Sequence, residues 1–242
     1  MKQDSDLTAG TLKIVGAALT SVFVVVGAYA YWLPSVHSLR RQNPMTTRYV
    51  KIYVDRIRKS GNRPAVAMRW TALDDISPYL RRAVLMAEDD RFYHHRGVDW
   101  VEFKKAMRYN WKKKEMARGA STISQQVARN LFLSPSRRAR RKFKEILIAR
   151  HLERSLGKRR ILEIYLNIVE WGEGVFGAQA ASRVYFGKNA KDLTPEEAVA
   201  LAAALPSPYR YNPSHPPDER TQAVRRHYLE RMAKEGLLSV SR

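Results

Sequence analysis

The chain has 242 residues, of which 45% are hydrophobic, enough for a folded core and too many for wholesale disorder. It contains no cysteine, which excludes a disulfide scaffold, a thiolate zinc site and a cysteine nucleophile. Its 44 Lys and Arg residues exceed its 23 Asp and Glu residues, and the net charge is +21. Such an excess favours polyanionic partners: nucleic acid, anionic lipid head groups or phosphorylated substrates.

Residues 14–33 form an uncharged apolar run that ends in aromatic residues and is followed by Pro34. Its length is what a helix needs to cross about 30 Å of hydrocarbon, and aromatic residues are common at membrane interfaces. The alternative is a cleaved signal peptide, but the run is long for one and no small-residue cleavage site is evident. We expect a tail at 1–13, a transmembrane helix at 14–33 and a basic body at 34–242. Basic residues flank both ends of the run, so charge leaves the orientation open.

Helical periodicity dominates the body and predicts a mostly α-helical domain. Ser77 and Pro78 form a typical helix start, and apolar residues follow at helical spacing from Leu80 to Ala87. The expected helices begin near Ser77, Asp99, Ser121 or Thr122, Arg141, Lys158, Thr194 and Asp218. Strand signals are weak, and residues 49–54 are the best strand candidate.

Glu88 is the first candidate for chemistry. It follows Val84 by four residues and Leu80 by eight, so a helix places it at the C-terminal end of the apolar stripe. Burial disfavours the charged carboxylate and raises its pKa, which suits a general base near neutral pH. The alternative is a helix-end carboxylate paired with Arg81 or Arg91.

The residues after Glu88 are expected to shape a turn. Asp89 is expected to cap or orient neighbouring groups, and Gly97 to adopt a left-handed conformation. His95 has two interpretations: a base or metal ligand, or a side chain that hydrogen-bonds within the turn.

The segment before the third helix combines a glycine, two hydroxyl residues and two amides. These residues are Gly119, Ser121, Thr122, Gln125 and Gln126. The free backbone amides of a helix start form an anion site, and Arg129 follows one to two turns later. The alternative is an ordinary capped helix.

A basic run precedes Glu145. Its members are Arg137, Arg138, Arg140, Arg141, Lys142 and Lys144. Arg141 and Lys142 share a helix face with Glu145, so we expect these cations to keep its carboxylate ionised. The environments of a desolvated Glu88 and a charge-compensated Glu145 would then separate the pKa values of the two carboxyl groups, as is often seen in catalytic acid/base pairs. The alternatives are a solvated basic face and nucleic-acid binding.

Together, four segments resemble the peptidoglycan glycosyltransferase family (glycosyltransferase family 51), most closely its stand-alone members. The four motifs are Glu88-Asp89-x-x-Phe92-x-x-His95-x-Gly97, Gly119-x-Ser121-Thr122-x-x-Gln125-Gln126, Arg141-Lys142-x-x-Glu145 and Lys158-x-x-Ile161-Leu162-Glu163-x-Tyr165-Leu166-Asn167. Their order and separation make the resemblance specific. Ser124 and Arg129 depart from it, because the family usually has Thr and commonly has Lys there.

The resemblance implies a lysozyme-like, mostly α-helical fold and polymerisation of lipid II into β-1,4-linked glycan strands with release of undecaprenyl pyrophosphate. It implies a single-pass protein of the cell inner membrane, with a cytoplasmic N-terminus and a periplasmic catalytic domain. The partners it implies are lipid II, the growing glycan chain, the membrane, penicillin-binding transpeptidases and division proteins, with no nucleic acid. It implies no transpeptidase activity.

The resemblance also implies the site residues. Glu88 and Glu145 are the catalytic candidates. The substrate-binding candidates are Asp89, Ser121, Thr122, Gln125, Gln126, Arg129, Arg137, Arg141 and Lys142. Glu88 would deprotonate the GlcNAc 4-hydroxyl as it attacks MurNAc C1 with inversion. Two roles for Glu145 stay open: orienting the basic groups, or helping to hold a divalent cation, Mg²⁺ or Mn²⁺, at the pyrophosphate. The resemblance does not by itself require a cofactor.

Aromatic residues interleaved with lysines between Trp100 and Met116 indicate an interfacial amphipathic surface. Two other functions stay open on the residues alone. One is a glycan-cleaving enzyme on a similar fold, in which Glu88 would be a general acid. The other is a membrane-anchored protein that binds nucleic acid or another anionic polymer through its basic face.

Overall fold

The computed structural model describes residues 16–17, 19–24, 27, 33–113, 119–135 and 139–238. The chain divides into two units, Met1–Ser35 and Val36–Arg242. Much of the apolar run at 14–33 lies outside the described residues, and Leu19, Val22 and Phe23 within it are exposed. In the ranges that are described, no helix combines the length and apolar character needed to span a membrane.

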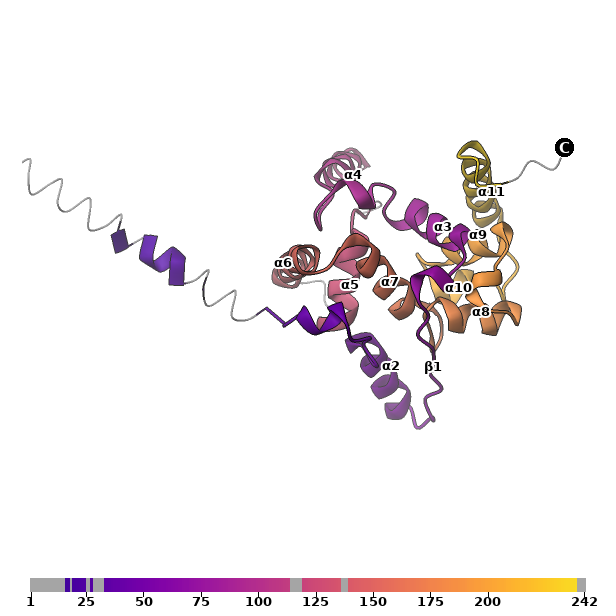
Figure 1. The fold of residues 1–242 in the computed structure, drawn as a ribbon, viewed down its shortest axis with the longest axis horizontal. Coiled ribbons are helices and arrows are strands. Elements are labelled where there is room, and N and C mark those ends of the chain that lie inside the picture. The colour runs from indigo at the N-terminus through magenta and orange to yellow at the C-terminus, as the bar shows by residue number, and fades with distance from the viewer. Residues whose placement is uncertain are drawn as a thin grey trace, which may run out of the picture. The chain divides into compact units, whose positions relative to one another are not determined.

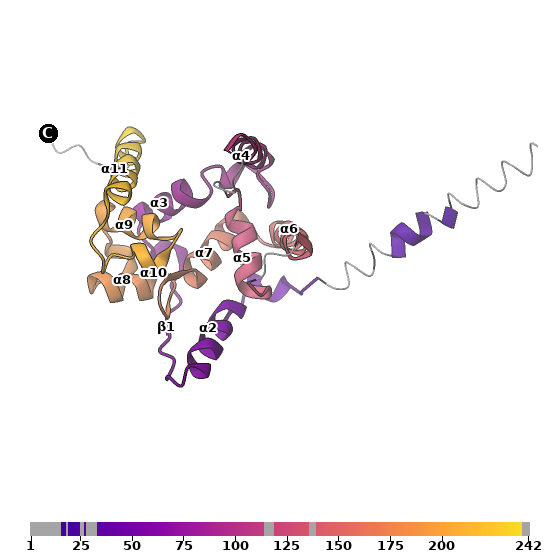
Figure 2. The same cartoon turned by 180° about the vertical axis from the view of Figure 1, so that it is seen from behind.

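The second unit is mostly helical, which confirms the predicted class (Figures 1 and 2). Its α-helices are α2 (Arg48–Lys59), α3 (Pro78–Glu88), α4 (Trp100–Lys113), α5 (Ile123–Phe132), α6 (Ala139–Ser155), α7 (Lys158–Ile168), α8 (Ala178–Phe186), α9 (Pro195–Ala204), α10 (Pro208–Tyr211) and α11 (Glu219–Lys234). Short 3-10 helices are η1 (His37–Arg40), η2 (Leu73–Asp75), η3 (Phe92–His94) and η4 (Ala190–Asp192). The strands are β1 (Ala67–Met68), β2 (Glu170–Gly172) and β3 (Val175–Phe176).

Two helix groups supply the core. In one, α3 packs on α9 and α11 packs on both; in the other, α5 packs on α6 and α7. The apolar stripe predicted on α3 is buried, with Leu80 and Val84 fully covered. Ile123 and Val127 of α5 are likewise fully covered. Burial of these side chains fixes the end of α3 and the start of α5, which carry the first two motifs.

The predicted strand at 49–54 is wrong, because these residues belong to helix α2. Thr47 caps that helix by accepting a hydrogen bond from the Val50 amide at 3.0 Å. Val50, Tyr53 and Ile57 then pack around Phe176. The β-branched and aromatic residues at 49–54 suit either a strand or a helix. The helical spacing of the residues that pack around Phe176 continues to Ile57, beyond the six residues of the predicted strand.

A small sheet and α8 carry no strong sequence signal. β1 pairs in parallel with β3, and β2 pairs antiparallel with β3. Gly177 precedes α8 with φ of 85°, and a Cβ there would lie 2.6 Å from the Asn167 carbonyl oxygen. This close approach ties α8 to the end of α7. Asn167 also exchanges hydrogen bonds with the Thr71 backbone at 2.7 and 2.8 Å, so it has a structural role.

Candidate active site

Glu88 ends α3, and its carboxyl group is mostly buried, as its place on the apolar stripe predicted. Burial raises the pKa of this carboxyl group, although a hydrogen bond from Gln126 and the charge of Arg129 oppose the rise. The Gln126 Nε2 atom lies 2.5 Å from Glu88 Oε2. The alternative pairing with Arg81 or Arg91 is wrong, because these arginines pair with Asp74 and Asp99. A raised carboxyl pKa suits proton transfer near neutral pH.

Gln126 is itself held by two donors. Arg129 Nη2 and the Tyr165 hydroxyl each lie 3.4 Å from Gln126 Oε1. Tyr165 is fully buried, so its hydroxyl gives Gln126 a fixed partner from α7. The amide of Gln126 therefore turns its nitrogen toward Glu88, and it joins the first motif to the second and the fourth.

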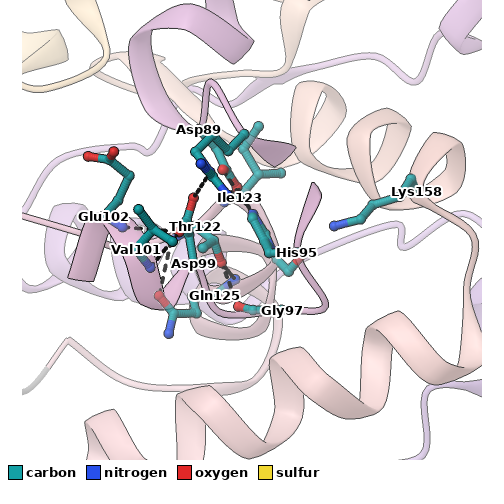
Figure 3. A network of polar contacts seen from close by, with 12 residues as sticks. Asp89, His95, Gly97, Asp99, Val101, Glu102, Thr122, Ile123, Gln125 and Lys158 are labelled. Carbon is teal, nitrogen blue, oxygen red and sulfur yellow. Dashed lines mark hydrogen bonds and ion pairs between the residues drawn. The ribbon is translucent and has the colours of Figure 1, made fainter. Parts of the chain in front are cut away.

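Asp89 directly follows α3 in the chain, and its side chain lies against the start of α5 (Figure 3). Its carboxylate accepts a hydrogen bond from the Ile123 amide at 2.9 Å and contacts His95 Nε2 at 2.9 and 3.0 Å. The sequence left two interpretations of His95, a base or metal ligand and a side chain that hydrogen-bonds within the turn. The contact of its Nε2 with Asp89 supports the second. Asp89 thus supplies the negative charge that a helix N-terminus favours.

Thr122 is the N-cap of α5, which settles the choice between Ser121 and Thr122. It forms a capping box with Gln125, and its hydroxyl donates to the Gly97 carbonyl at 2.7 Å. The expectation of free amides here needs correction, because Asp89 and Thr122 already accept from the amides of Ile123 and Gln125. Side-chain cations, more than these backbone donors, are left to bind an anion.

The third motif forms a charged cluster against the start of α5. Glu145 is 1% exposed and pairs with Arg141 and with Lys142, whose Nζ lies 2.6 Å from Glu145 Oε1. Lys142 also donates to Ser121 Oγ at 2.8 Å and contacts Gln125 Oε1 at 3.5 Å. The helix spacing had predicted both ion pairs of Glu145.

This cluster does not fit a divalent cation held by Glu145. Arg141 contacts one oxygen of the carboxylate and Lys142 the other, and both cations would repel a metal ion. In the described ranges, no three His, Asp or Glu side chains converge in a way that could hold a metal. The arrangement favours the orienting role among the two left open for Glu145.

A pocket of about 240 Å³ brings Glu88 and Asp89 together with Ser121 and Thr122. A second pocket of similar volume is lined by Gln126 and Arg129. Gln126 connects the two through its bond to Glu88. Arg137 lies outside the described residues, so its predicted role stays a prediction.

Three further residues line these pockets and were not predicted from the sequence as site residues. Asp99 lines the first pocket, accepts from the Val101 amide at 2.9 Å and pairs with Arg91. Glu170 and Tyr209 line the second pocket, and Tyr209 donates to Glu170 at 2.7 Å. Burial raises the pKa of Tyr209 to about 12. The sequence marks Asp99 only as a helix cap, and 39 positions separate Glu170 from Tyr209, so no local pattern joins them.

On a helical frame, a mostly buried carboxyl group at the end of α3 and a cationic cluster against the start of α5 define a candidate catalytic site. The sequence model described as Transglycosylase matches residues 56–233. The biosynthetic peptidoglycan transglycosylase of Azoarcus sp. is 43% identical over 84% of this chain and 88% of its own. Those of Aromatoleum aromaticum and Alcanivorax borkumensis are 48% and 42% identical, over 70% and 83% of this chain and 74% and 79% of theirs.

The chain belongs to the transglycosylase family, among the peptidoglycan glycosyltransferases of cell wall biogenesis that its motifs predicted.

Proposed function

We propose that this protein polymerises lipid II into β-1,4-linked glycan strands and releases undecaprenyl pyrophosphate. The observation that carries the proposal is the desolvated Glu88 carboxyl group, which accepts a hydrogen bond from Gln126 of the second motif. Lys142 of the cationic cluster donates to Ser121 of the same motif. The names of the relatives support the same substrate class.

Glu88 acts as the general base. With a raised pKa, its carboxylate accepts the proton of the acceptor GlcNAc 4-hydroxyl as that oxygen attacks MurNAc C1 of the donor. The bond from C1 to the pyrophosphate oxygen breaks on the opposite face. The α linkage of the donor is thereby replaced by a β-1,4 glycosidic bond to the acceptor. The electron pair of the broken bond leaves with undecaprenyl pyrophosphate.

Cationic side chains stabilise the leaving pyrophosphate. Arg129, Arg137 and Lys142 are the groups we assign to this role, since arginine and lysine form strong charge-assisted hydrogen bonds to phosphate. Glu145 orients Arg141 and Lys142, and Ser121 fixes the Lys142 ammonium group.

The proposed setting is the outer face of the inner membrane, with a lysozyme-like catalytic domain at 34–242, a transmembrane helix at 14–33 and a cytoplasmic tail at 1–13. Exposed apolar side chains at Leu19, Val22 and Phe23 support the membrane helix. Penicillin-binding transpeptidases and division proteins are the proposed protein partners, since glycan strands must be crosslinked by a separate reaction after they are polymerised.

A polymerisation assay with purified lipid II tests the proposal. We expect wild-type protein to form glycan strands, and Glu88→Gln to lose about 10²–10⁴-fold in rate, the usual contribution of a general base. Glu173→Gln, the same change at a side chain that is 61% exposed, is the matched control and should keep wild-type activity.

Incubating the protein separately with lipid II and with finished polymer separates synthesis from cleavage. Shortening of polymer without consumption of lipid II would overturn the proposal in favour of a glycan-cleaving enzyme. Near wild-type polymerisation by Glu88→Gln would remove Glu88 from the mechanism.

A further inference from the structure

A third pocket, with several basic side chains in its wall, opens beside the start of α4 and has a volume of about 290 Å³. Arg91, Arg96, Arg150 and His94 line it, and Asp99 is the one carboxylate among the described residues of its wall. Asp99 pairs with Arg91 at 3.1 Å and caps α4, so its charge is already matched. The catalytic mechanism uses none of these side chains.

Two arginines of this pocket keep their charge available. Arg96 and Arg150 are exposed at the pocket wall, and neither makes a side-chain ion pair or hydrogen bond in the part of the chain that the structure describes. They come from the turn before α4 and from α6, so the fold brings them together across 54 positions of sequence. Two guanidinium groups around one small pocket suit an anion with several oxygen atoms, such as a phosphate ester.

An apolar stripe leads away from this pocket along α4. Its residues Trp100, Phe103, Met107 and Trp111 are between 36% and 86% exposed and follow helical spacing on one face. Trp100 lines the pocket and packs edge-to-face on Phe103. Side chains of this size, exposed in a row, mark a surface that another apolar phase covers.

Charge determines which apolar phase fits. Lysines at 104, 105, 112 and 113 lie on the same helix as the stripe, the composition of a helix that lies in the interface of an anionic membrane. The pocket therefore offers a phosphate site at one end of a surface suited to acyl chains. A free phosphate would use the arginines and leave the stripe uncovered, whereas a phospholipid uses both.

We infer that Arg96 and Arg150 bind the head group of an anionic phospholipid whose acyl chains lie along the exposed stripe of α4. The inference rests on the proposed membrane setting and adds a lipid site separate from the lipid II site. The Arg91–Asp99 pair lines both this pocket and the pocket of Glu88, so it forms the wall between them.

Tryptophan fluorescence tests this inference on the full chain in neutral detergent micelles. Phosphatidylglycerol with brominated acyl chains should quench the stripe tryptophans saturably, and brominated phosphatidylcholine should not. Arg96→Gln/Arg150→Gln should raise the half-saturating lipid fraction by about tenfold or more, since each lost charge-assisted hydrogen bond weakens binding substantially. Arg58→Gln/Lys59→Gln removes the same charge from exposed positions of α2 and should leave the titration unchanged.

Three outcomes would overturn the lipid site. An equal loss in the α2 control would mean general attraction to the basic body. Displacement of the brominated lipid by excess inorganic phosphate would mean a site for soluble phosphate. A loss of lipid II polymerisation by the pocket variant in micelles without phosphatidylglycerol would place the pocket in the substrate path. If wild-type protein fails to polymerise lipid II, the proposed function fails, while the quenching titration still decides the lipid site.

Discussion

Gln126 Nε2 lies 2.5 Å from Glu88 Oε2, so an amide of the second motif holds the carboxylate of the first. The two residues are 38 positions apart in the chain. The hydrogen bond favours the charged form of Glu88, while burial favours the neutral form, and burial is the larger effect. The pKa of Glu88 therefore depends on the balance between burial and the Gln126 hydrogen bond, and a substitution at Gln126 should change it.

Gln126→Met should raise the pKa of Glu88 further, because it removes the hydrogen bond and keeps the side-chain volume. A general base works only when deprotonated, so the acidic limb of the pH–rate profile should move to higher pH. Initial rates of lipid II polymerisation across the pH range measure this shift. Movement of the limb to lower pH would contradict the assignment of Glu88 as base.

Glu145→Gln should lower both stability and activity. The variant leaves Arg141 and Lys142 beside a neutral, buried side chain, and loss of one partner of a buried pair is strongly destabilising. We expect a loss of roughly 2 kcal/mol in urea unfolding, less than for fully buried pairs because both cations are partly exposed. Lys142→Met, which keeps Glu145 paired with Arg141, should lower polymerisation with a smaller loss of stability.

The same variant separates the two roles of Glu145. If Glu145 only orients its cations, the ratio of rates with added Mg²⁺ and with chelator stays the same in wild type and Glu145→Gln. A magnesium effect present in wild type and absent in the variant would restore the metal-holding role.

The sequence predicted the parts of this site that depend on local spacing. The burial of Glu88 follows from its place on the α3 stripe, and the pairs of Glu145 follow from helix neighbours three and four residues apart. The sequence did not predict that Asp89 would accept from the Ile123 amide, because that contact depends on how α3 and α5 pack. Tertiary packing also decided α2, where residues 49–54 suit both a strand and a helix.

Asp89→Ala should destabilise the fold because it removes an acceptor from the start of α5 and a partner from His95. Loss of a helix-capping acceptor with a second buried hydrogen bond costs on the order of 2 kcal/mol. Asp89→Asn keeps one acceptor oxygen and should recover part of that loss. Urea unfolding of both variants measures the difference, and equal stability of wild type and Asp89→Ala would show that the contact is dispensable.

Gly97→Ala should destabilise the protein for two independent reasons. Its φ of 91° lies in the left-handed region, and a Cβ there would lie 3.1 Å from the backbone of Ala149 on α6. The Gly97 carbonyl also accepts from the Thr122 hydroxyl, so strain at this position would loosen the start of α5. We expect a loss of about 2 kcal/mol or more, measured by urea unfolding.

Gly119→Ala is the matched control, because a Cβ at Gly119 meets no atom within 4 Å and its φ is not in the left-handed region. Its stability should stay within about 0.5 kcal/mol of wild type, as for most substitutions at unconstrained positions. If both variants unfold at the same urea concentration, the close approach of the Gly97 turn to α6 is not what holds α5 in place. A large loss confined to Gly97→Ala would instead link the geometry of this turn to the Thr122 cap, and through it to the pocket that contains Glu88.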